Sequence, residues 1–343
     1  MKTALSGIYF IIWWLWDFLY EYNILVPKQV AAKVVSVGNL TVGGTGKTPI
    51  TIFLARFYQS KGYRVGIVSR GYKGNYQGKV ALVSDGKSVL TSSDICGDEP
   101  YLMAKRLSGK LREAQTPSAG AAAGVCVAVS KLRHDGCQML IDKFNVNLIL
   151  LDDGFQHRRL YRDLNLLLID TTEKNNALLP KGPMREGFPA AKRADIIILT
   201  REGESPKMPE STIPVLHAVF LPVALVHLKT GTSYPLTKLS GASVLAFCAI
   251  GNPNSFIKIL ANLGAKIEAS IFFRDHFRYS VAEIKAIGEK ALAFGVKWIV
   301  TTEKDAVKIE SLSFPEIDLF VLQVDVVFRE PSGLWEPYFL STK

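Results

Sequence analysis

Short apolar runs alternate with helical patterns along most of the chain. The β-branched run "AKVVSVGN" predicts a strand, and a glycine turn separates it from "TPITIFLARFYQSKG", whose apolar residues recur at helical spacing. The runs "RVGIVSRGY", "VNLILLDDGFQ", "LNLLLID" and "ADIIILT" predict further strands, and "GDEPYLMAKRLS" predicts the start of a helix. Strands that alternate with helices form parallel sheets, so we expect a doubly wound, mostly parallel α/β sheet.

Proline, serine and glycine accumulate before a second α/β pattern begins, which places a boundary near residues 220–240. The later runs "SVLAFCAIGNPNSFIKILANLGAKI" and "GVKWIVTTEKDA" predict strands, turns and helices of a smaller unit. We therefore expect an N-terminal helix (1–25), a first domain (26–225) and a smaller α/β domain (226–343) that contributes to the active-site cleft. The stretch "LREAQTPSAGAAAG" (111–124) predicts a surface insertion.

The N-terminal stretch "ALSGIYFIIWWLWDFLYEYNIL" is apolar without interruption only over residues 8–16. Crossing a bilayer takes ~20 apolar residues, and here Asp17 and Glu21 follow, four apart on one helical face. Tryptophan and tyrosine crowd the rest and favour the membrane–water boundary. The pattern predicts an amphipathic helix that lies in the interface. A true membrane span, a signal peptide and a helix packed in the core are the alternatives.

Composition adds a basic surface to this picture. The chain has 343 residues, 48% of them hydrophobic, and a formal net charge of +10. A basic surface favours anionic partners such as nucleic acid, acidic lipid headgroups or phosphorylated substrates, although a merely basic soluble protein has the same composition. No nucleic-acid motif or basic stripe with interleaved aromatics occurs, so we expect no nucleic-acid partner, and no protein partner is evident. The four cysteines lack disulfide or zinc spacing, which fits a reducing compartment.

The stretch between the first strand and helix predicts a phosphate-binding loop. Its glycines allow backbone N–H groups to surround phosphates, and the helix N-terminus adds a favourable dipole. Lys47 can reach the β- and γ-phosphates, and the Thr48 hydroxyl can bind Mg²⁺. The first glycine of the usual pattern is replaced by Thr41, which costs little where the backbone stays in an ordinary region. A tight strand–helix turn without a ligand is the alternative. The predicted nucleotide-binding residues are Thr41, Val42, Gly43, Gly44, Thr45, Gly46, Lys47 and Thr48.

Acidic pairs mark two further candidate positions. Asp152 and Asp153 end a buried strand, where a second Mg²⁺-holding motif belongs. Adjacent carboxylates repel each other unless a cation lies nearby, although one of them could instead cap a helix. Asp98 and Glu99 open a helix, where acids serve either in catalysis or only to complement the helix dipole.

Two later segments carry candidate chemistry, and a third is a decoy. His276 in "FFRDHFRYS" is either catalytic or a structural histidine, and Arg185 and Glu186 in "LLPKGPMREGF" suit phosphate or metal contacts or form a plain basic turn. The stretch "TTEKDA" is close to the guanine-reading motif of GTPases. Its Lys304 and Asp305 are adjacent, so the spacing fails and we do not infer GTP.

Eight stretches in order resemble the tetraacyldisaccharide 4'-kinase family of Gram-negative bacteria. They are "SVGNLTVGGTGKTP", "SRGY", "GDEP", "LLDDGFQH", "LLPKGPMRE", "IGNP", "FRDHFRYS" and "TTEKDAVK". The resemblance implies a P-loop NTPase-like fold and Mg²⁺-dependent transfer of the ATP γ-phosphoryl group to the 4'-hydroxyl of a lipid-linked glucosamine disaccharide 1-phosphate. The product is lipid IVA, made at the cytoplasmic face of the inner membrane. A P-loop ATPase or kinase of a soluble small molecule is the alternative, and a nucleotide-switched binding protein is another.

The resemblance also implies roles for the site residues. Asp98 is the general base on the 4'-hydroxyl, supported by His276 either as an imidazolium or as a neutral ring that accepts or orients a proton. Lys47, Arg133 and Arg185 offset the charge of the transferring phosphoryl group, although a leucine precedes Arg133 where the family usually has aspartate. The Mg²⁺ candidates are Thr48, Glu99, Asp152, Asp153 and Glu186.

Overall fold

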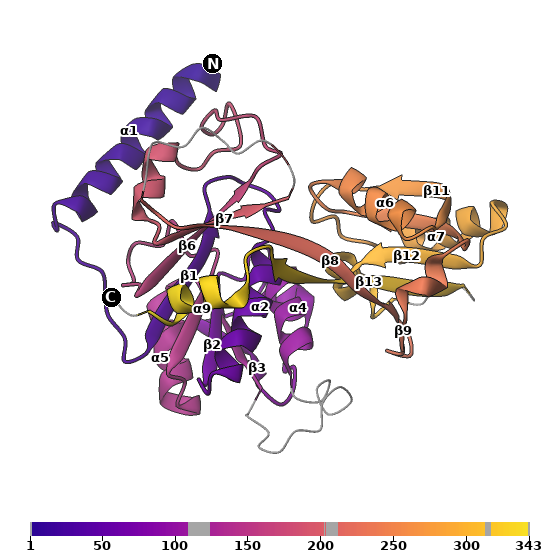
Figure 1. The fold of residues 1–343 in the computed structure, drawn as a ribbon, viewed down its shortest axis with the longest axis horizontal. Helices are drawn as coiled ribbons and strands as arrows, with labels where there is room; N and C mark the ends of the chain where they lie inside the picture. The colour runs from indigo at the N-terminus through magenta and orange to yellow at the C-terminus, as the bar shows by residue number, and fades with distance from the viewer. Residues whose placement is uncertain (1, 109–123, 202, 204–211, 313–316, 342–343) are drawn as a thin grey trace. The chain divides into compact units, whose positions relative to one another are not determined.

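The computed structural model describes residues 2–108, 124–201, 203, 212–312 and 317–341. Apart from Gly124, the expected insertion at 111–124 lies outside the described residues. The chain divides into two compact units, and each contains both strands and helices (Figure 1).

The first unit comprises Met1–Val219 and Val326–Lys343, and the second comprises Phe220–Asp325. We expected everything from residue 226 to 343 in the second domain. The C-terminal segment instead returns to the first unit, because Trp335 and Phe339 of the last helix pack edge-to-face on Phe57, with ring centroids 5.3 and 5.9 Å away. Burial of these rings stabilises the return.

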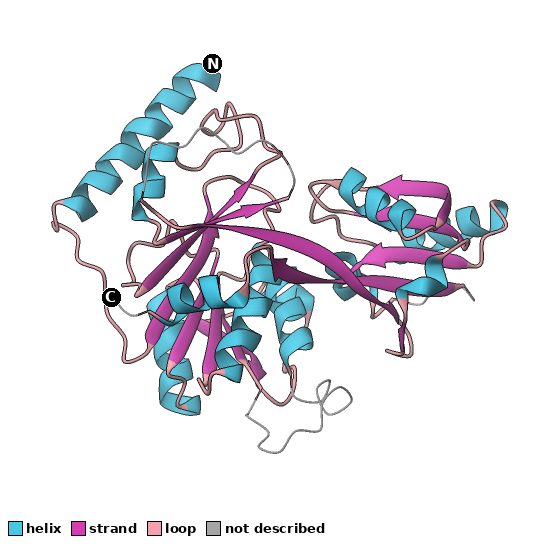
Figure 2. Ribbon diagram, viewed as in Figure 1, coloured by secondary structure: helices cyan, strands magenta, loops and turns pink. Residues whose placement is uncertain are grey.

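A mostly parallel sheet lies at the centre of the first unit (Figure 2). Its order is β8, β7, β6, β1, β5, β2, β4, β3, and the described strands of this series pair in parallel except β3, which runs antiparallel to β4. In β1, Val37 lies opposite Asp152 and Gly38 opposite Leu167, so the carboxyl ends of three strands meet at one edge. The strands are β1 (Lys33–Asn39), β2 (Val65–Ser69), β3 (Val80–Asp85), β4 (Cys126–Ser130), β5 (Leu148–Asp152), β6 (Leu164–Asp170), β7 (Ile196–Thr200) and β8 (Val215–His227).

Helices cover both faces of this sheet. Cys137 and Leu140 of α5 pack in one cluster with Val34, Val68 and Ile149. The alternate strand residues point to the opposite face, where they are also buried and where α2 and α4 pack on each other. The doubly wound α/β fold expected from the sequence is confirmed. The helices of this unit are α1 (Lys2–Glu21), α2 (Lys47–Ser60), α3 (Ser93–Cys96), α4 (Asp98–Leu107), α5 (Arg133–Phe144), the 3-10 helix η2 (Phe188–Arg193) and α9 (Ser332–Leu340).

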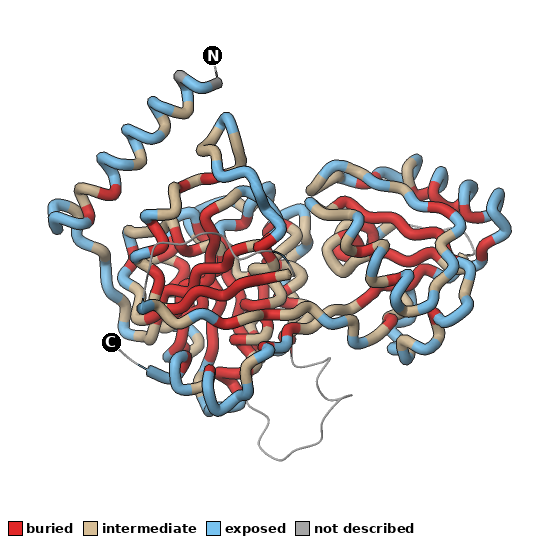
Figure 3. Tube along the Cα trace, turned by 45° about the horizontal axis from the view of Figure 1, so that its top comes forward, coloured by how far each residue is buried: buried red, intermediate tan, exposed pale blue. Residues whose placement is uncertain are grey.

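The N-terminal helix α1 differs from the others in its exposure (Figure 3). Ser6, Tyr9, Trp13, Asp17 and Tyr20 form a half-buried to buried stripe at helical spacing. The remaining surface carries exposed apolar side chains: Leu5, Ile8, Phe10, Ile11, Ile12, Trp14, Leu15 and Trp16. Among the described helices, none has the length and apolar character needed to cross a bilayer.

The second unit repeats the alternation of parallel strands and helices. Its parallel strands lie in the order β11, β10, β12, β13, with α7 packed on Phe247 and α6 on Ala246 and Cys248, which face opposite sides. The chain enters this unit within β8 and leaves it within β13. Its elements are β9 (Ser233–Tyr234), the 3-10 helix η3 (Leu236–Leu239), β10 (Ser243–Cys248), α6 (Pro253–Asn262), β11 (Lys266–Phe272), α7 (Val281–Ala293), β12 (Trp298–Thr302), α8 (Glu303–Ile309) and β13 (Asp318–Phe328).

Candidate active site

A glycine loop joins β1 to α2 at the carboxyl edge of the first sheet. Thr41, the departure from the usual pattern, forms an antiparallel bridge with Met184, an extended conformation that needs no glycine. Gly43 and Gly46 have φ values of 120° and 87°, which strongly favour glycine. A side chain added at Gly43 or Gly44 would meet no atom within 4 Å. The loop therefore presents an open backbone surface directly before a helix N-terminus.

Lys47, the first residue of α2, is held inside this loop by three oxygens. Its Nζ lies 3.0 Å from Oδ1 of Asn39, 3.4 Å from Oδ1 of Asp153 and 3.5 Å from the carbonyl of Gly43. Asn39 ends β1 and precedes the P-loop motif, so the motif did not indicate a role for it. The ammonium group is thus fixed at the loop, where a phosphate bound by the loop would meet it.

The pKa values of the two aspartates at the end of β5 are shifted in opposite directions. Asp152 is buried, and its Oδ2 accepts a hydrogen bond from Ser69 at 2.9 Å. Within the described part of the chain its Oδ1 has no hydrogen-bond partner. Burial, together with the charge of Asp153, raises the pKa of Asp152 to about 6. Burial also acts against ionisation of Asp153, but Lys47 and Arg185 outweigh it and lower the pKa of Asp153.

Arg185 reaches Asp153 from the loop between β6 and η2. Its Nη1 lies 3.0 and 2.9 Å from the two carboxylate oxygens of Asp153 and 3.2 Å from Oε1 of Gln156. The Arg185 backbone is fixed from two sides, because its N–H donates to the Leu40 carbonyl at 2.7 Å and its carbonyl accepts from the Tyr9 hydroxyl at 2.7 Å. A residue of α1 therefore holds the loop that carries this guanidinium.

Glu186 belongs to a different set of contacts from its neighbour. Its Oε2 accepts a hydrogen bond from Arg193, whose other Nη lies 2.7 Å from Oδ1 of Asp17 in α1. Arg158 contacts the same Asp17 oxygen at 2.5 Å. In this arrangement Glu186 takes part in the buried ion pairs that fasten α1, and its expected Mg²⁺ role stays a prediction.

Asp98 and Glu99 open α4 after a tight glycine. Gly97 has a φ of 90°, and a Cβ there would lie 2.6 Å from the carbonyl oxygen of Tyr72, so a side chain at this position would clash. This close approach brings the start of α4 against the "SRGY" turn. The negative charge of Glu99 contributes to the raised pKa of Asp152, which places Glu99 near the end of β5.

Arg133 begins α5 and is almost fully buried. Its Nη1 donates to the Ser130 carbonyl at 2.9 Å, while its Nε has no hydrogen-bond partner among the described residues. Burial lowers its pKa, and the charges of Asp152 and Asp153 act in the opposite direction. The charges of both aspartates thus act on the guanidinium. Its expected role beside the transferring phosphoryl group stays a prediction.

The described residues contain no group of three His, Cys, Asp or Glu side chains arranged to hold a metal. Such a cage is not needed for Mg²⁺, which kinases bind through one or two carboxylates together with substrate phosphates. The buried Oδ1 of Asp152 without a partner is an oxygen ligand of the required type. The residues present therefore fit a magnesium ion, with Asp152 as the candidate that the structure supports, while the expected role of Thr48 stays a prediction.

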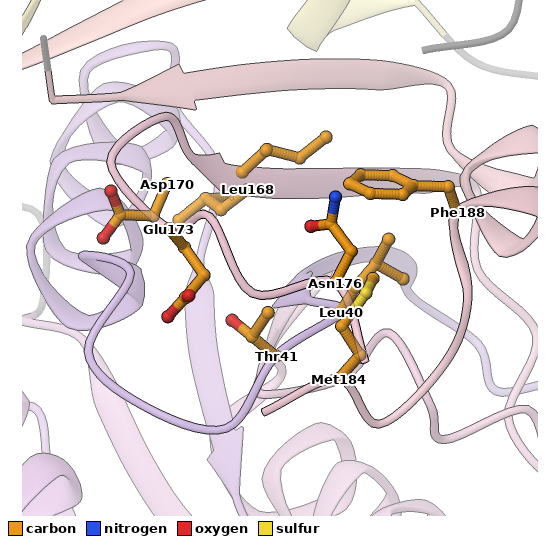
Figure 4. A pocket seen from close by; sticks show the side chains of 9 residues that line it. Leu40, Thr41, Leu168, Asp170, Glu173, Asn176, Met184 and Phe188 are labelled. Carbon is orange, nitrogen blue, oxygen red and sulfur yellow. The ribbon is translucent and has the colours of Figure 1, made fainter. Parts of the chain in front are cut away.

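A pocket opens beside the glycine loop, at the carboxyl end of β6 (Figure 4). The acidic side chains of Asp170 and Glu173 lie at one end of it, and Phe188 and Met184 at the other. Arg201 lies 2.7 Å from Oδ2 of Asp170 and also donates to the carbonyl of Gly44 at 2.8 Å. Arg201 follows β7 outside any recognised motif, so nothing in the sequence indicated this support of the loop.

His276 lies in the second unit, after β11. Its backbone is left-handed, with a φ of 58°, and its Nε2 lies 3.1 Å from Nζ of Lys304. Because Asp98 belongs to the first unit, the expected pairing of His276 with Asp98 stays a prediction. Asp305, of the decoy motif, is fully buried and accepts hydrogen bonds from the Ala249 N–H and the Tyr279 hydroxyl, which suits a structural role.

The site has the parts of a P-loop nucleotide-binding protein. They are an open glycine loop between a parallel strand and a helix, a lysine at the helix start, and carboxylates at the end of the adjacent strand. The family model for tetraacyldisaccharide-1-P 4'-kinase matches residues 2–337. A tetraacyldisaccharide 4'-kinase of Pelobacter propionicus is 35% identical over 97% of this chain and 90% of its own. One from Syntrophus aciditrophicus is 36% identical over 86% and 81%.

A solved structure agrees with these matches. The crystal structure of LpxK from Aquifex aeolicus, described as an "apo" form in complex with ATP, superposes with a TM-score of 0.78 at 31% identity, covering 98% of this chain and 96% of the other. The chain belongs to the tetraacyldisaccharide 4'-kinase family, as the resemblance indicated. It is a kinase with a P-loop fold.

Proposed function

We propose that this chain transfers the γ-phosphoryl group of ATP to the 4'-hydroxyl of tetraacyl disaccharide 1-phosphate, forming lipid IVA. The observation that carries the proposal is the meeting of Lys47 and Arg185 on Asp153 beside the open glycine loop, in a chain of this family. Phosphoryl transfer depends mainly on positioning and on stabilising charge, and two cations at this point supply both.

Both cations contact the single carboxylate of Asp153, so one positive charge of the three groups stays uncompensated by it. When the phosphates of ATP occupy the loop, their oxygens compete with that carboxylate for Lys47 and Arg185. The buried guanidinium of Arg133, with its Nε lacking a described partner, adds a third donor. We assign these three side chains to the charge that develops on the transferring group.

Asp98 takes the general-base role in this proposal. A sugar hydroxyl is a poor nucleophile, and a positioned carboxylate both orients it and accepts its proton. The rigid turn at Gly97 fixes the position of Asp98 at the start of α4. His276 supports this step from the second unit.

A magnesium ion bound by ATP would be held by Oδ1 of Asp152 and the hydroxyl of Thr48, with Glu99 nearby. Such an ion would neutralise negative charge on the phosphates. Ionised Asp152 is disfavoured by burial, as its raised pKa shows, and a cation beside it removes that penalty.

The lipid acceptor requires contact with a membrane, and α1 supplies the surface for it. Its exposed tryptophans and aliphatic side chains suit the headgroup boundary of a bilayer, where such residues are enriched. A net charge of +10 favours an anionic membrane surface and a phosphorylated lipid. Because ATP is cytosolic, we place the enzyme at the cytoplasmic face of the inner membrane, associated through α1.

The test is a mass-spectrometric assay of the full-length protein with Mg-ATP and tetraacyl disaccharide 1-phosphate in detergent micelles. We expect a lipid product heavier by one phosphoryl group, absent for Lys47→Ala and present for Lys61→Ala, a lysine at the other end of α2. Consumption of ATP without a phosphorylated lipid would overturn the lipid assignment. Full activity of a chain lacking residues 1–25 on a soluble acceptor would favour the alternative of a soluble small-molecule kinase.

A further inference from the structure

Asp275, His276 and Lys304 form a charged cluster within the second unit. Lys304 lies in the first turn of α8, and the other two follow β11. The Lys304 ammonium is 3.1 Å from Oδ1 of Asp275 and 3.1 Å from Nε2 of His276. All three side chains are partly shielded from solvent, so these contacts are stronger than they would be on an open surface.

The distances identify which imidazole nitrogen carries the hydrogen. An ammonium group has three donors and no acceptor, so a ring nitrogen that hydrogen-bonds to it must accept through its lone pair. The alternative is that Nε2 carries the hydrogen and donates to Asp275. The nearest ion-pair distance between them is 3.9 Å, to Oδ2, which is beyond hydrogen-bond reach. The contact with Lys304 therefore favours Nε2 as an acceptor, an arrangement that leaves the ring hydrogen on Nδ1.

We propose that Lys304 is a positioning residue that holds His276 as the Nδ1–H tautomer, so that the ring serves as a hydrogen-bond donor and not as a proton acceptor. The inference about the tautomer rests on the contacts of the second unit alone. The inference about what the ring does in the reaction rests on the proposed function.

The chain segments that carry the two partners are joined through one buried carboxylate. Asp305, the residue after Lys304, accepts hydrogen bonds from the Thr302 hydroxyl at 2.7 Å and the Ala249 N–H at 3.0 Å. The Tyr279 hydroxyl, three residues after His276, donates to the other oxygen of Asp305 at 3.0 Å. The contact between Lys304 and His276 is therefore set by the fold and not by two mobile side chains.

The backbone of His276 supports the same arrangement. Its N–H donates to Oδ1 of Asp275 at 3.0 Å, and its φ of 58° is a left-handed conformation that a residue with a side chain rarely adopts. Burial disfavours ionisation of Asp275, but the charge of Lys304, with the hydrogen bonds from Lys304 and from the His276 N–H, outweighs this effect and lowers the pKa of Asp275. A carboxylate that stays charged keeps the ammonium in place beside the ring.

This tautomer limits the chemistry open to His276. With Nε2 engaged by Lys304, Nδ1–H can stabilise a carboxylate or an alkoxide that gains negative charge, but it cannot remove a proton from a hydroxyl. In the proposed reaction the proton then goes to a carboxylate such as Asp98, and the imidazole contributes a hydrogen bond. Of the two forms considered for His276, an imidazolium or a neutral ring, the neutral donor is the one that fits Lys304.

The test is a two-bond ¹H–¹⁵N correlation spectrum of the histidine rings in the full-length, ¹⁵N-labelled protein near neutral pH. The chain has five histidines, and the signal lost in His276→Gln identifies the ring. We expect the wild-type spectrum to show the Nδ1–H pattern. An Nε2–H or a doubly protonated pattern would overturn the proposal without any variant.

Lys304→Met extends the test by removing the ammonium at similar length. We expect the His276 signal to leave the Nδ1–H pattern, Lys304→Arg to retain it, and the exposed Lys297→Met to leave it unchanged. The kcat of Lys304→Met should fall roughly tenfold, the effect of one charge-assisted hydrogen bond, with an unchanged KM for ATP. An unaltered His276 pattern in Lys304→Met would overturn the role of Lys304. Absence of lipid kinase activity in the wild type would instead refute the proposed function.

Discussion

The two units contain the same connection and use it differently. In each, a parallel strand leads into a helix whose first turn carries a lysine, Lys47 after β1 and Lys304 after β12. In the first unit a glycine loop separates strand from helix and leaves its backbone open. In the second, β12 runs directly into α8, and the Thr302 hydroxyl and the Asp305 carboxylate occupy the helix start. A helix N-terminus can bind an external phosphate only where the chain has not already supplied an anion of its own.

The buried carboxylates near these two helices, Asp152 and Asp305, differ in the same way. Asp305 is bound through both oxygens, whereas Asp152 has an oxygen without a hydrogen-bond partner in the described part of the chain. The first arrangement suits a residue that holds a fold together. The second suits a residue that receives a cation with a ligand.

The largest effect is expected when Lys47 and Lys304 are each replaced by methionine. Lys47→Met should lower phosphoryl transfer by about 10²–10³-fold, since it removes a preorganised cation from the phosphates. Lys304→Met should leave the KM for ATP unchanged, because the start of α8 is filled. Initial rates over a range of ATP concentrations measure both effects. A raised KM for ATP in Lys304→Met would contradict the claim that only the first unit binds phosphate at its helix start.

Asp305→Asn should destabilise the second unit by about 3 kcal/mol, because it leaves Lys308 as a buried charge without its counter-ion. Lys308 lies 2.7 Å from Asp305 and is itself buried. Hydrogen exchange of peptides from β10, β12 and α8 measures the local unfolding free energy. Glu289→Gln, an exposed acid of α7, is the control and should have no effect. Equal exchange in Asp305→Asn and the wild type would contradict a structural role.

Asp152→Asn should instead stabilise the ligand-free protein. Burial raises the pKa of Asp152 to about 6 from its ordinary value of 3.8, so the folded state holds its proton more tightly than the unfolded state. Its contribution is favourable below the unfolded pKa and is lost as the pH rises through the folded pKa. Replacing the ionisable group should therefore stabilise the fold by about 3 kcal/mol at neutral and higher pH, and by little below about pH 4.

Urea unfolding of Asp152→Asn at these two pH values measures the gain, and Mg-ATP should then stabilise the variant less than it stabilises the wild type. A variant that is less stable than the wild type at neutral pH would show that Asp152 is a structural residue like Asp305.

Arg201→Ala should produce the smallest effect of the series. The glycine loop has no cap of its own, and Arg201 supports it through the Gly44 carbonyl. Losing this charged hydrogen bond, worth about 1.5 kcal/mol, should raise the KM for ATP roughly tenfold. Asp170→Asn should have a similar effect, and the double variant should add little, since both residues belong to one contact. Additive effects would show that Arg201 and Asp170 act separately.

The sequence predicts the strands, the glycine loop and the acids at the strand ends, because each depends on local pattern. The difference between Asp152 and Asp153 could not be predicted in this way. It arises from a left-handed backbone at Asp153, with a φ of 50°, which lets its carboxylate meet Lys47 and Arg185. The support from Arg201 likewise joins segments 157 residues apart, and the pairing of Arg193 with Asp17 joins segments 176 residues apart.

The exposed apolar surface of α1 has a kinetic consequence if the enzyme works on a membrane as we propose. An enzyme held at an interface meets its lipid by lateral diffusion, so the relevant substrate quantity is the mole fraction of lipid in the surface and not its bulk concentration. Diluting the lipid with inert detergent would then slow the reaction at constant total substrate. Tyr9 and Asp17 join this helix to the loop of Arg185 and to Arg193. A membrane that binds α1 would therefore also fix the orientation of the active site relative to the lipid surface.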